Sequence, residues 1–243
     1  ELCQDLGFSQ TGPKATIGRY LMAWQDLREW MTEIEKLGEL RVVKGATWQG
    51  DIGDITEMLD HSNGSPCVVF EDIPGYSTGQ RVIVNCNGTR KRQAITLGIS
   101  SEEATHQLLM SRWEAILRDL TPVPPKFVDD GPVLENTVKG NDVDLELFPA
   151  PQWHPKDGGR FIGTASVNIM RDRESAWVNL GTYRNQILKP NRLGVWISPG
   201  KHGRLIRDKY FGDGDKCPIV VLVGCDPLMF WAACVEGIPY GMS

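Results

Sequence analysis

The chain has 243 residues, of which 41% are hydrophobic and 23% are charged. This composition is ordinary for a globular protein and excludes disordered, collagen-like and coiled-coil chains. Its 26 basic and 31 acidic side chains give a net charge of −5, without the basic surplus of most nucleic-acid-binding domains. The most apolar stretch, Ile219 to Val235, is cut by Asp226-Pro227 and is shorter than the about 20 residues of a membrane span. We therefore predict no nucleic-acid partner and no membrane span.

Six cysteines are spread along the chain without a CxxC pair or the Cys/His spacing of a zinc finger. The first ten residues have neither a basic start nor an apolar core, so we expect no secretory signal. Buried free thiols in a reducing cytoplasm are the simplest interpretation. The cysteines are at positions 3, 67, 86, 217, 225 and 234.

The first 120 residues predict a mixed α/β region. Apolar side chains recur at helical spacing from Leu27 to Leu37, with Asp26 as the N-cap, Glu29 completing a capping box and Gly38 ending the helix. Further along, apolar runs bounded by turn residues indicate strands. The predicted strands are 39–44, 67–71 and 81–85, and further helices are predicted over 51–59 and from Ser101 to residue 120.

Residues 121–132 contain four prolines and end the preceding helix, so we place a domain boundary there. The predicted domains are an N-terminal mixed α/β domain, 1–125, and a β-rich domain, 126–243. Five strand candidates at this spacing favour a barrel or sandwich over a βαβ array, so the predicted fold class is α/β of the α+β type. The strand candidates are 143–151, 160–172, 176–188, 193–200 and 218–227, with short helices after His202 and after Pro227.

Only four histidines are available as catalytic or metal-binding groups. His61, in a polar loop, and His106, on an amphipathic helix, have the settings of structural residues. His154 lies in a loop rich in proline and glycine, where a functional and a structural role are both open. His202 follows Lys201 at a strand-to-helix corner, where backbone N–H groups and the helix dipole favour a phosphate or metal position. The alternative is an exposed pair of basic side chains in a loop.

The segment 179–184 gathers an amide, a glycine, a hydroxyl, a phenol and a guanidinium within six residues. Along a strand, residues 179, 181 and 183 share one face and residues 180, 182 and 184 share the other. A bend at Gly181 would bring Asn179 and Arg184 toward one pocket, where Arg184 would hold a substrate carboxylate in a two-pronged contact. The alternative is an edge strand with an exposed arginine.

Several segments together resemble the UbiD family of prenylated-FMN-dependent decarboxylases. The pattern WVNLGTYR is followed by PGKHG, then by an apolar strand and AACVEGIPYGMS. FIGTASVNIMRD upstream and LREWMTEIEKLGEL near the start fit the same family. The resemblance runs from Leu27 to Ser243, and the ordered combination of these short motifs is what makes it specific.

The resemblance implies the reversible, non-oxidative decarboxylation of an aromatic or α,β-unsaturated carboxylic acid. Loss of CO₂ from such a carbon needs an electron sink, which standard side chains other than a lysine Schiff base do not offer, so a cofactor is expected. The implied cofactor is prenylated FMN, supplied by a separate flavin prenyltransferase, with Mn²⁺ or Mg²⁺ tying its phosphate to the protein and K⁺ beside it. The β-rich region would be a flavin-reductase-like split β-barrel, and the enzyme would be a homo-oligomer.

By similarity, Asn179 and His202 are two ligands of the divalent ion, and Arg184 is the catalytic arginine. Main-chain oxygens near Ala233, Cys234 and Glu236 are implied for the monovalent ion. The residues implied to line the cofactor are Thr164, Asn179, Leu180, Gly181, Thr182, Tyr183, Arg184, Lys201 and His202.

Family members continue well beyond the point that corresponds to Ser243, and the resemblance places the third metal ligand and the proton-transfer glutamates there. We therefore expect this chain to supply most of the cofactor pocket and to be inactive as an isolated fragment. Two alternatives stay open. One is a split-barrel reductase that binds plain FMN without a divalent metal, and the other is a non-catalytic subunit or fragment that needs a partner chain.

Overall fold

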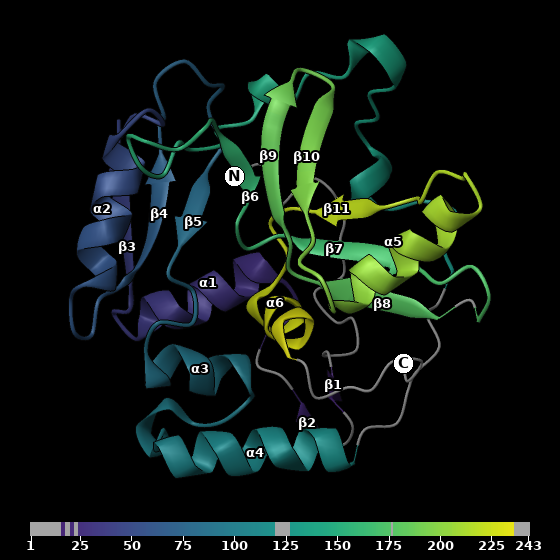
Figure 1. The fold of residues 1–243 in the computed structure, drawn as a ribbon. Coiled ribbons are helices and arrows are strands. Elements are labelled where there is room, and N and C mark those ends of the chain that lie inside the picture. Colours follow the sequence, from purple (N-terminus) through teal and green to yellow (C-terminus); the bar gives the residue numbers. More distant parts are fainter. Residues whose placement is uncertain (1–15, 18–19, 22–23, 120–126, 176, 236–243) are drawn as a thin grey trace.

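The computed structural model of the chain describes residues 16–17, 20–21, 24–119, 127–175 and 177–235. A mixed α/β region in the first half and a β-rich region in the second half lie side by side (Figure 1). A short antiparallel pair, β1 (Thr16–Ile17) and β2 (Tyr20–Leu21), precedes them. None of the helices in these described ranges is long and apolar enough to cross a membrane.

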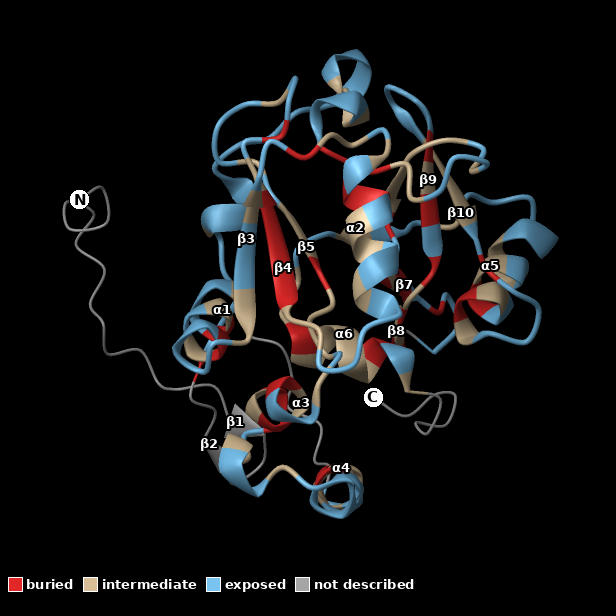
Figure 2. Ribbon diagram, turned by 90° about the vertical axis from the view of Figure 1, so that its left-hand side faces the viewer, coloured by how far each residue is buried: buried red, intermediate tan, exposed pale blue. Residues whose placement is uncertain are grey.

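The first region is built on a three-stranded sheet of order β3-β4-β5. β3 (Leu40–Lys44) and β4 (Cys67–Glu71) are parallel, and β5 (Val82–Val84) pairs antiparallel with β4. The central strand β4 is buried, as Figure 2 shows. Its run CVVF is apolar at every position because helices cover both faces of the sheet.

Two helices pack on the two faces of this sheet. α1 (Leu27–Lys36) packs Trp30 and Ile34 against Cys67, and α2 (Asp51–Asp60) packs Ile52 into the cluster that contains Phe70. Successive side chains of a strand point to opposite faces, so the two helices bury alternate residues of β4. These three strands and two helices match the predicted elements closely in position.

The predicted N-cap at the start of α1 is confirmed, while the Glu29 carboxylate bonds to the residue before the cap rather than to the cap itself. The Asp26 carboxylate accepts a hydrogen bond from the N–H of Glu29 at 2.9 Å, and the Glu29 carboxylate accepts one from the N–H of Gln25 at 2.8 Å. The first hydrogen bond satisfies a backbone donor that the first helical turn leaves without an intrahelical partner, and the second satisfies the N–H of the residue before the N-cap.

The second region contains two three-stranded antiparallel sheets, of order β10-β9-β6 and β11-β7-β8. The region is β-rich, as predicted. The described strands form two separate sheets rather than one closed barrel, so the split-barrel expectation is not confirmed. The strands are β6 (Phe161–Gly163), β7 (Val167–Arg171), β8 (Val178–Gly181), β9 (Arg184–Lys189), β10 (Arg192–Trp196) and β11 (Val220–Leu222).

Two helices flank these sheets, at the positions that the sequence predicts. α5 (His202–Gly212) packs along β8, and α6 (Pro227–Cys234) lies between the two regions (Figure 1). Leu228 of α6 packs against apolar clusters of the first region, and the ring of Trp231 lies 5.9 Å from that of Trp113 in α4 (His106–Arg118). α6 therefore ties the β-rich region to the helices of the first half.

Other predictions need correction. The predicted strand 143–151 contains only the 3-10 turn η4 (Leu145–Leu147), because Asp144 closes a tight turn by accepting from the N–H of Glu146. The helix predicted from Ser101 is a 3-10 turn, η1 (Ser101–Glu103), followed by α4, which Thr105 caps. Helix α3 (Arg90–Thr96) was not predicted. Two further 3-10 turns are η2 (Pro132–Leu134) and η3 (Gly140–Asp142).

Candidate functional site

The segment 179–184 runs from the end of β8 into the start of β9, and its burial alternates as the sequence predicts. Asn179, Gly181 and Tyr183 are buried, Leu180 and Thr182 are half-buried, and Arg184 is exposed. Asn179 thus belongs to the buried set and Arg184 to the exposed set. The bend that would bring their side chains to one pocket stays a prediction.

The phenol of Tyr183 lies between β8 and the start of α5. Its oxygen accepts a hydrogen bond from the backbone N–H of Gly203 at 3.0 Å and one from the side-chain amide of Asn179 at 3.3 Å. A Cβ added at Gly181 or at Gly203 would lie 2.5 Å from this oxygen. The phenol fits there because both positions are glycine, and it brings Asn179 and the beginning of α5 to one point.

Two buried asparagines that the sequence analysis missed hold the connection from β8 to β9. Asn168 on β7 donates to the carbonyls of Gly181 and Tyr183, at 3.4 and 3.2 Å. Asn185 on β9 donates to the same Tyr183 carbonyl and to the hydroxyl of Ser166, both at 2.8 Å. The side-chain oxygens of both asparagines are buried and have no hydrogen-bond partner within the described part of the chain. The sequence signal that could have identified these two asparagines is a polar residue at an inward-facing position of an otherwise apolar strand.

Helix α5 begins at the predicted strand-to-helix corner. Lys201 is its exposed N-cap, and His202, its first residue, is half-buried. The ring of His202 makes an edge contact with that of Trp177, with centroids 5.3 Å apart. The dipole at this end of the helix favours an anion and Lys201 adds positive charge, whereas the N–H groups of Gly203 and Arg204 already donate to the Tyr183 oxygen and the Lys201 carbonyl. This corner therefore has a positive potential that suits a phosphate group.

Asn179 and His202 are 23 positions apart in the sequence, but Asn179 and the residue after His202 share one hydrogen-bond acceptor. An amide oxygen and an imidazole nitrogen are suitable ligands for Mn²⁺, and a hard cation such as Mg²⁺ prefers oxygen. No group of three His, Cys, Asp or Glu side chains able to hold a metal occurs in the described ranges. These residues therefore fit a divalent ion as two members of a larger ligand set.

The remaining predicted site residues lie around the same strands. Thr164 is exposed in the connection between β6 and β7. The hydroxyl of Thr182 lies 3.7 Å from the thiol of Cys234, at the end of α6, and this contact brings the helix to β8. Ala233 is buried and Cys234 is exposed. Glu236 lies outside the described residues.

The cysteines of the described ranges are free thiols. Burial, together with the neighbouring Asp226 carboxylate, raises the pKa of the Cys225 thiol to about 11. Cys225 lies near the carbonyl of Ala165, next to Thr164, with its sulfur 4.0 Å from that oxygen. Burial also raises the pKa of Cys234, whereas its contact with Thr182 lowers it. Neither thiol is therefore a thiolate nucleophile near neutral pH.

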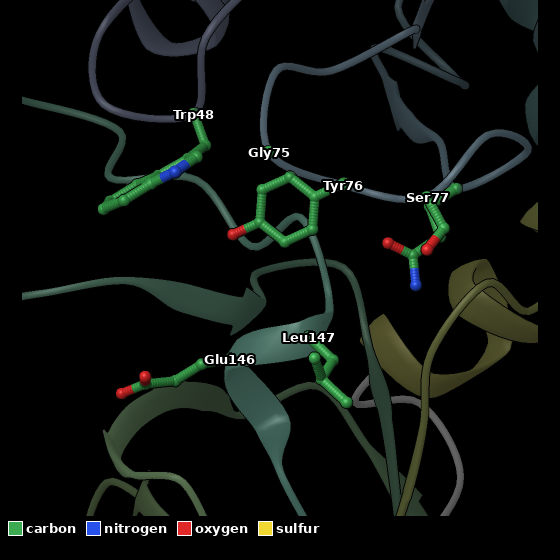
Figure 3. Close-up of a pocket in the computed structure, with 7 residues that line it drawn as sticks. Trp48, Gly75, Tyr76, Ser77, Glu146 and Leu147 are labelled. Atoms are coloured by element: carbon green, nitrogen blue, oxygen red, sulfur yellow. The ribbon is translucent and has the colours of Figure 1, made fainter.

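Other features that the sequence singled out lie elsewhere. His154 is exposed, with Nε2 3.5 Å from a Glu57 oxygen and Nδ1 3.6 Å from an Asp157 oxygen. A hollow of about 260 Å³ lies between the first region and η4 (Figure 3). Beside this hollow, the guanidinium of Arg160 lies 4.4 Å from the ring centre of Trp48. No predicted site residue lines the hollow, whose lining is Trp48, Gly75, Tyr76, Ser77, Gln80, Glu146 and Leu147.

Two matches to one protein family cover most of the chain. Residues 31–111 match the N-terminal domain of UbiD, described as 3-octaprenyl-4-hydroxybenzoate carboxy-lyase. Residues 126–243 match the Rift-related domain of the same family. The two matches follow each other in the order of the family's domains.

Named relatives and solved structures agree with these matches. The chain is 29% identical over 231 residues to a phenolic acid decarboxylase from Streptomyces sp., covering 90% of this chain and 46% of the relative. It superposes on the closed form of Sedimentibacter hydroxybenzoicus vanillic acid decarboxylase with a TM-score of 0.79 and 26% identity, covering 90% of this chain and 46% of that one.

A second solved structure is an evolved dimeric form of the UbiD-class enzyme HmfF from Pelotomaculum thermopropionicum, in complex with prFMN. It has a TM-score of 0.71 and 27% identity, and the match covers 83% of this chain and 45% of that one. The chain therefore spans about half the length of the relatives that it matches.

Proposed function

Because the chain belongs to the UbiD family of carboxy-lyases, we propose that the protein containing it catalyses the reversible, non-oxidative decarboxylation of an aromatic carboxylic acid with prenylated FMN. The observation that carries this proposal is the meeting of β8 and α5 at Tyr183, which brings Asn179 close to the helix that begins at His202. The similarity to solved decarboxylase structures supports it.

We propose further that residues 1–125 and 126–243 form two domains and that the second is a split barrel completed in the whole protein. The separate family matches to 31–111 and 126–243 support the boundary. A homo-oligomer in the cytoplasm, loaded by a flavin prenyltransferase, belongs to the same proposal. The free thiols of the described cysteines favour a reducing compartment.

Asn179 and His202 are proposed as two ligands of Mn²⁺ or Mg²⁺, beside the cofactor phosphate. The divalent ion would offset phosphate charge, and Lys201 together with the first turn of α5 would add positive potential at the same place. Main-chain oxygens near Ala233, Cys234 and Glu236 are proposed for K⁺. The contact between Thr182 and Cys234 supports the placement of that end of α6 beside β8.

Arg184 is proposed as the residue that holds the substrate carboxylate. Its side chain is exposed at the start of β9, and within the described residues its guanidinium has no ion pair. A planar guanidinium can hold a carboxylate with two parallel hydrogen bonds. Prenylated FMN, when bound, supplies the electron sink that loss of CO₂ from an unsaturated carbon requires. Arg184 would orient the scissile carboxylate, and the half-buried strand face around Leu180 and Thr182 would restrict water.

The test uses the complete protein, co-expressed with a flavin prenyltransferase. The bound flavin is identified by mass and by its absorption spectrum, and CO₂ release is measured from phenolic, heteroaromatic and polycyclic acids with Mn²⁺ and K⁺ present. We expect prenylated FMN and multiple turnovers with at least one acid. Plain FMN bound without a divalent metal and reduced by a nicotinamide would instead support a reductase, and absence of any flavin would support a non-catalytic subunit.

A further inference from the structure

We infer that Tyr183 is a positioning residue, whose phenol sets the orientation of the Asn179 amide relative to the start of α5. The inference rests on the proposed function, because it takes Asn179 and His202 as metal ligands. The resemblance implies that Tyr183 lines the cofactor. The structure buries the side chain and gives its hydroxyl two partners within the protein, which points to a different role.

The first argument concerns the two ends of the Asn179 amide. Its nitrogen donates to the Tyr183 oxygen at 3.3 Å, so the amide oxygen is directed away from the phenol. Asn179 is 4% exposed, and without this acceptor the nitrogen of the buried amide would lack a hydrogen bond to any described residue. Tyr183 thus selects the orientation in which the oxygen, the only metal-binding atom of the amide, is available.

The second argument concerns the helix. The N–H of Gly203 is one of the donors that the first turn of α5 leaves without an intrahelical acceptor, and it donates to the Tyr183 oxygen at 3.0 Å. His202 is the preceding residue. One oxygen therefore fixes the amide of Asn179 on β8 and the backbone beside His202 on α5.

The third argument concerns space around the ring. A Cβ at Gly203 would lie 2.5–2.8 Å from three phenol atoms, and one at Gly181 would lie 2.5–3.0 Å from three. The ring also belongs to the cluster formed with Met170, Trp177 and Ile206. The phenol is therefore held by packing on several sides, so its oxygen offers a rigid reference point for both partners.

The experiment compares Tyr183→Phe with the wild type in the complete protein. Tyr210→Phe is the matched control, because Tyr210 packs against the same cluster and its hydroxyl donates to the Arg171 carbonyl at 3.2 Å, without a contact to Asn179. Mn²⁺ affinity is measured by EPR titration of the flavin-free protein, and the EPR line shape is recorded at saturating Mn²⁺. Thermal unfolding of the metal-free proteins reports general stability.

We expect Tyr183→Phe to weaken Mn²⁺ binding by about 10–100-fold, the range found when partners of metal ligands are removed, and to change the line shape. Tyr210→Phe should leave both unchanged, even if both variants lower the melting temperature. Wild-type Mn²⁺ affinity in Tyr183→Phe, or an equal loss in both variants, would overturn the inference while the proposed function stands. A wild-type protein that binds neither Mn²⁺ nor flavin would overturn the proposed function, and the inference with it.

Discussion

The side chain of Asn179 and the backbone N–H of Gly203 donate to the same atom, the phenolic oxygen of Tyr183. The first donor belongs to β8 and the second to α5, so a single side chain joins a sheet to a helix. The glycines at 181 and 203 leave the room that this arrangement needs. The candidate site therefore depends on the residues that shape it, Gly181, Tyr183 and Gly203, as well as on the residues proposed as metal ligands.

The proposed metal ligands can be tested separately from turnover. Asn179→Ala and His202→Ala should each weaken Mn²⁺ binding by more than about tenfold in the complete protein, because each removes one ligand from the coordination shell. EPR titration of flavin-free protein measures this. His154→Ala is the control, since His154 lies in an exposed group with Glu57 and Asp157. Unchanged affinity in the Asn179 and His202 variants would show that the metal lies elsewhere.

Replacement of Arg184 tests the substrate contact. We expect Arg184→Ala to lower kcat/KM by about 10²–10³-fold, the cost of losing one charge-stabilising group, while bound flavin remains. Arg184→Lys should fail as well, because an ammonium ion does not reproduce a planar two-pronged contact. Arg192→Lys on the adjacent strand β10 is the matched control. Near wild-type CO₂ release by Arg184→Lys, with the product identified, would exclude the proposed role.

Local signals explain which parts of the fold could be predicted. Helix α1 has an N-cap, helical apolar spacing and a terminating glycine, all within residues 26–38. Helix α3 has an N-cap, Thr89, and a glycine after its end, Gly98, but it lacks helical apolar spacing, and its Arg92 is fully buried. The guanidinium of Arg92 is held by Glu39 at 2.7 Å and by the Ser65 carbonyl at 2.9 Å. Those partners are distant in sequence, so the burial of a charged residue there could not be foreseen.

In the candidate site, too, features set by local sequence were predictable and features that depend on distant partners were not. Alternating burial from Asn179 to Arg184 follows from the period of a strand and was predictable. The role of Asn168 and Asn185 was not, because it depends on two sheets meeting at the Tyr183 carbonyl. The contact between Tyr183 and Gly203 crosses from one element to another over 20 residues, and no local pattern indicates it.

The raised pKa of Cys225 predicts slow alkylation. With a pKa of about 11, Cys225 should react with iodoacetamide about 10²-fold more slowly at pH 8 than an ordinary thiol of pKa about 8.5. Its rate should rise about tenfold per pH unit until about pH 10–11. Because the folded pKa exceeds the unfolded one, the stability linked to this thiol is present at neutral pH and declines as the pH rises from about 8.5 to 11. Peptide mass spectrometry measures the rate, with Cys225→Ser assigning the peak, and alkylation as fast as that of glutathione would contradict the prediction.

The last prediction concerns the contact between the two regions, where Gly53 of α2 faces the backbone of Trp153. A Cβ at Gly53 would lie 2.1 Å from the Trp153 carbonyl oxygen, and that atom cannot rotate away as a side chain could. The Trp153 segment is also pinned on both sides, by a hydrogen bond from the Gln152 N–H to the Trp48 carbonyl at 3.0 Å and by one from the Phe161 N–H to the Pro151 carbonyl at 2.9 Å.

In an open helix, Gly→Ala stabilises by about 1 kcal/mol, because alanine has the higher helix propensity. At Gly53 we expect the opposite sign, with a net loss of about 1–3 kcal/mol from overpacking and a lower melting temperature by calorimetry. Gly212→Ala in α5 is the matched control, since a Cβ there meets nothing within 4 Å, and it should be neutral or stabilising. If Gly53→Ala is as stable as Gly212→Ala, the prediction is wrong. The backbone at Trp153 can then move away from α2 at little cost in free energy, despite the hydrogen bonds on either side of it.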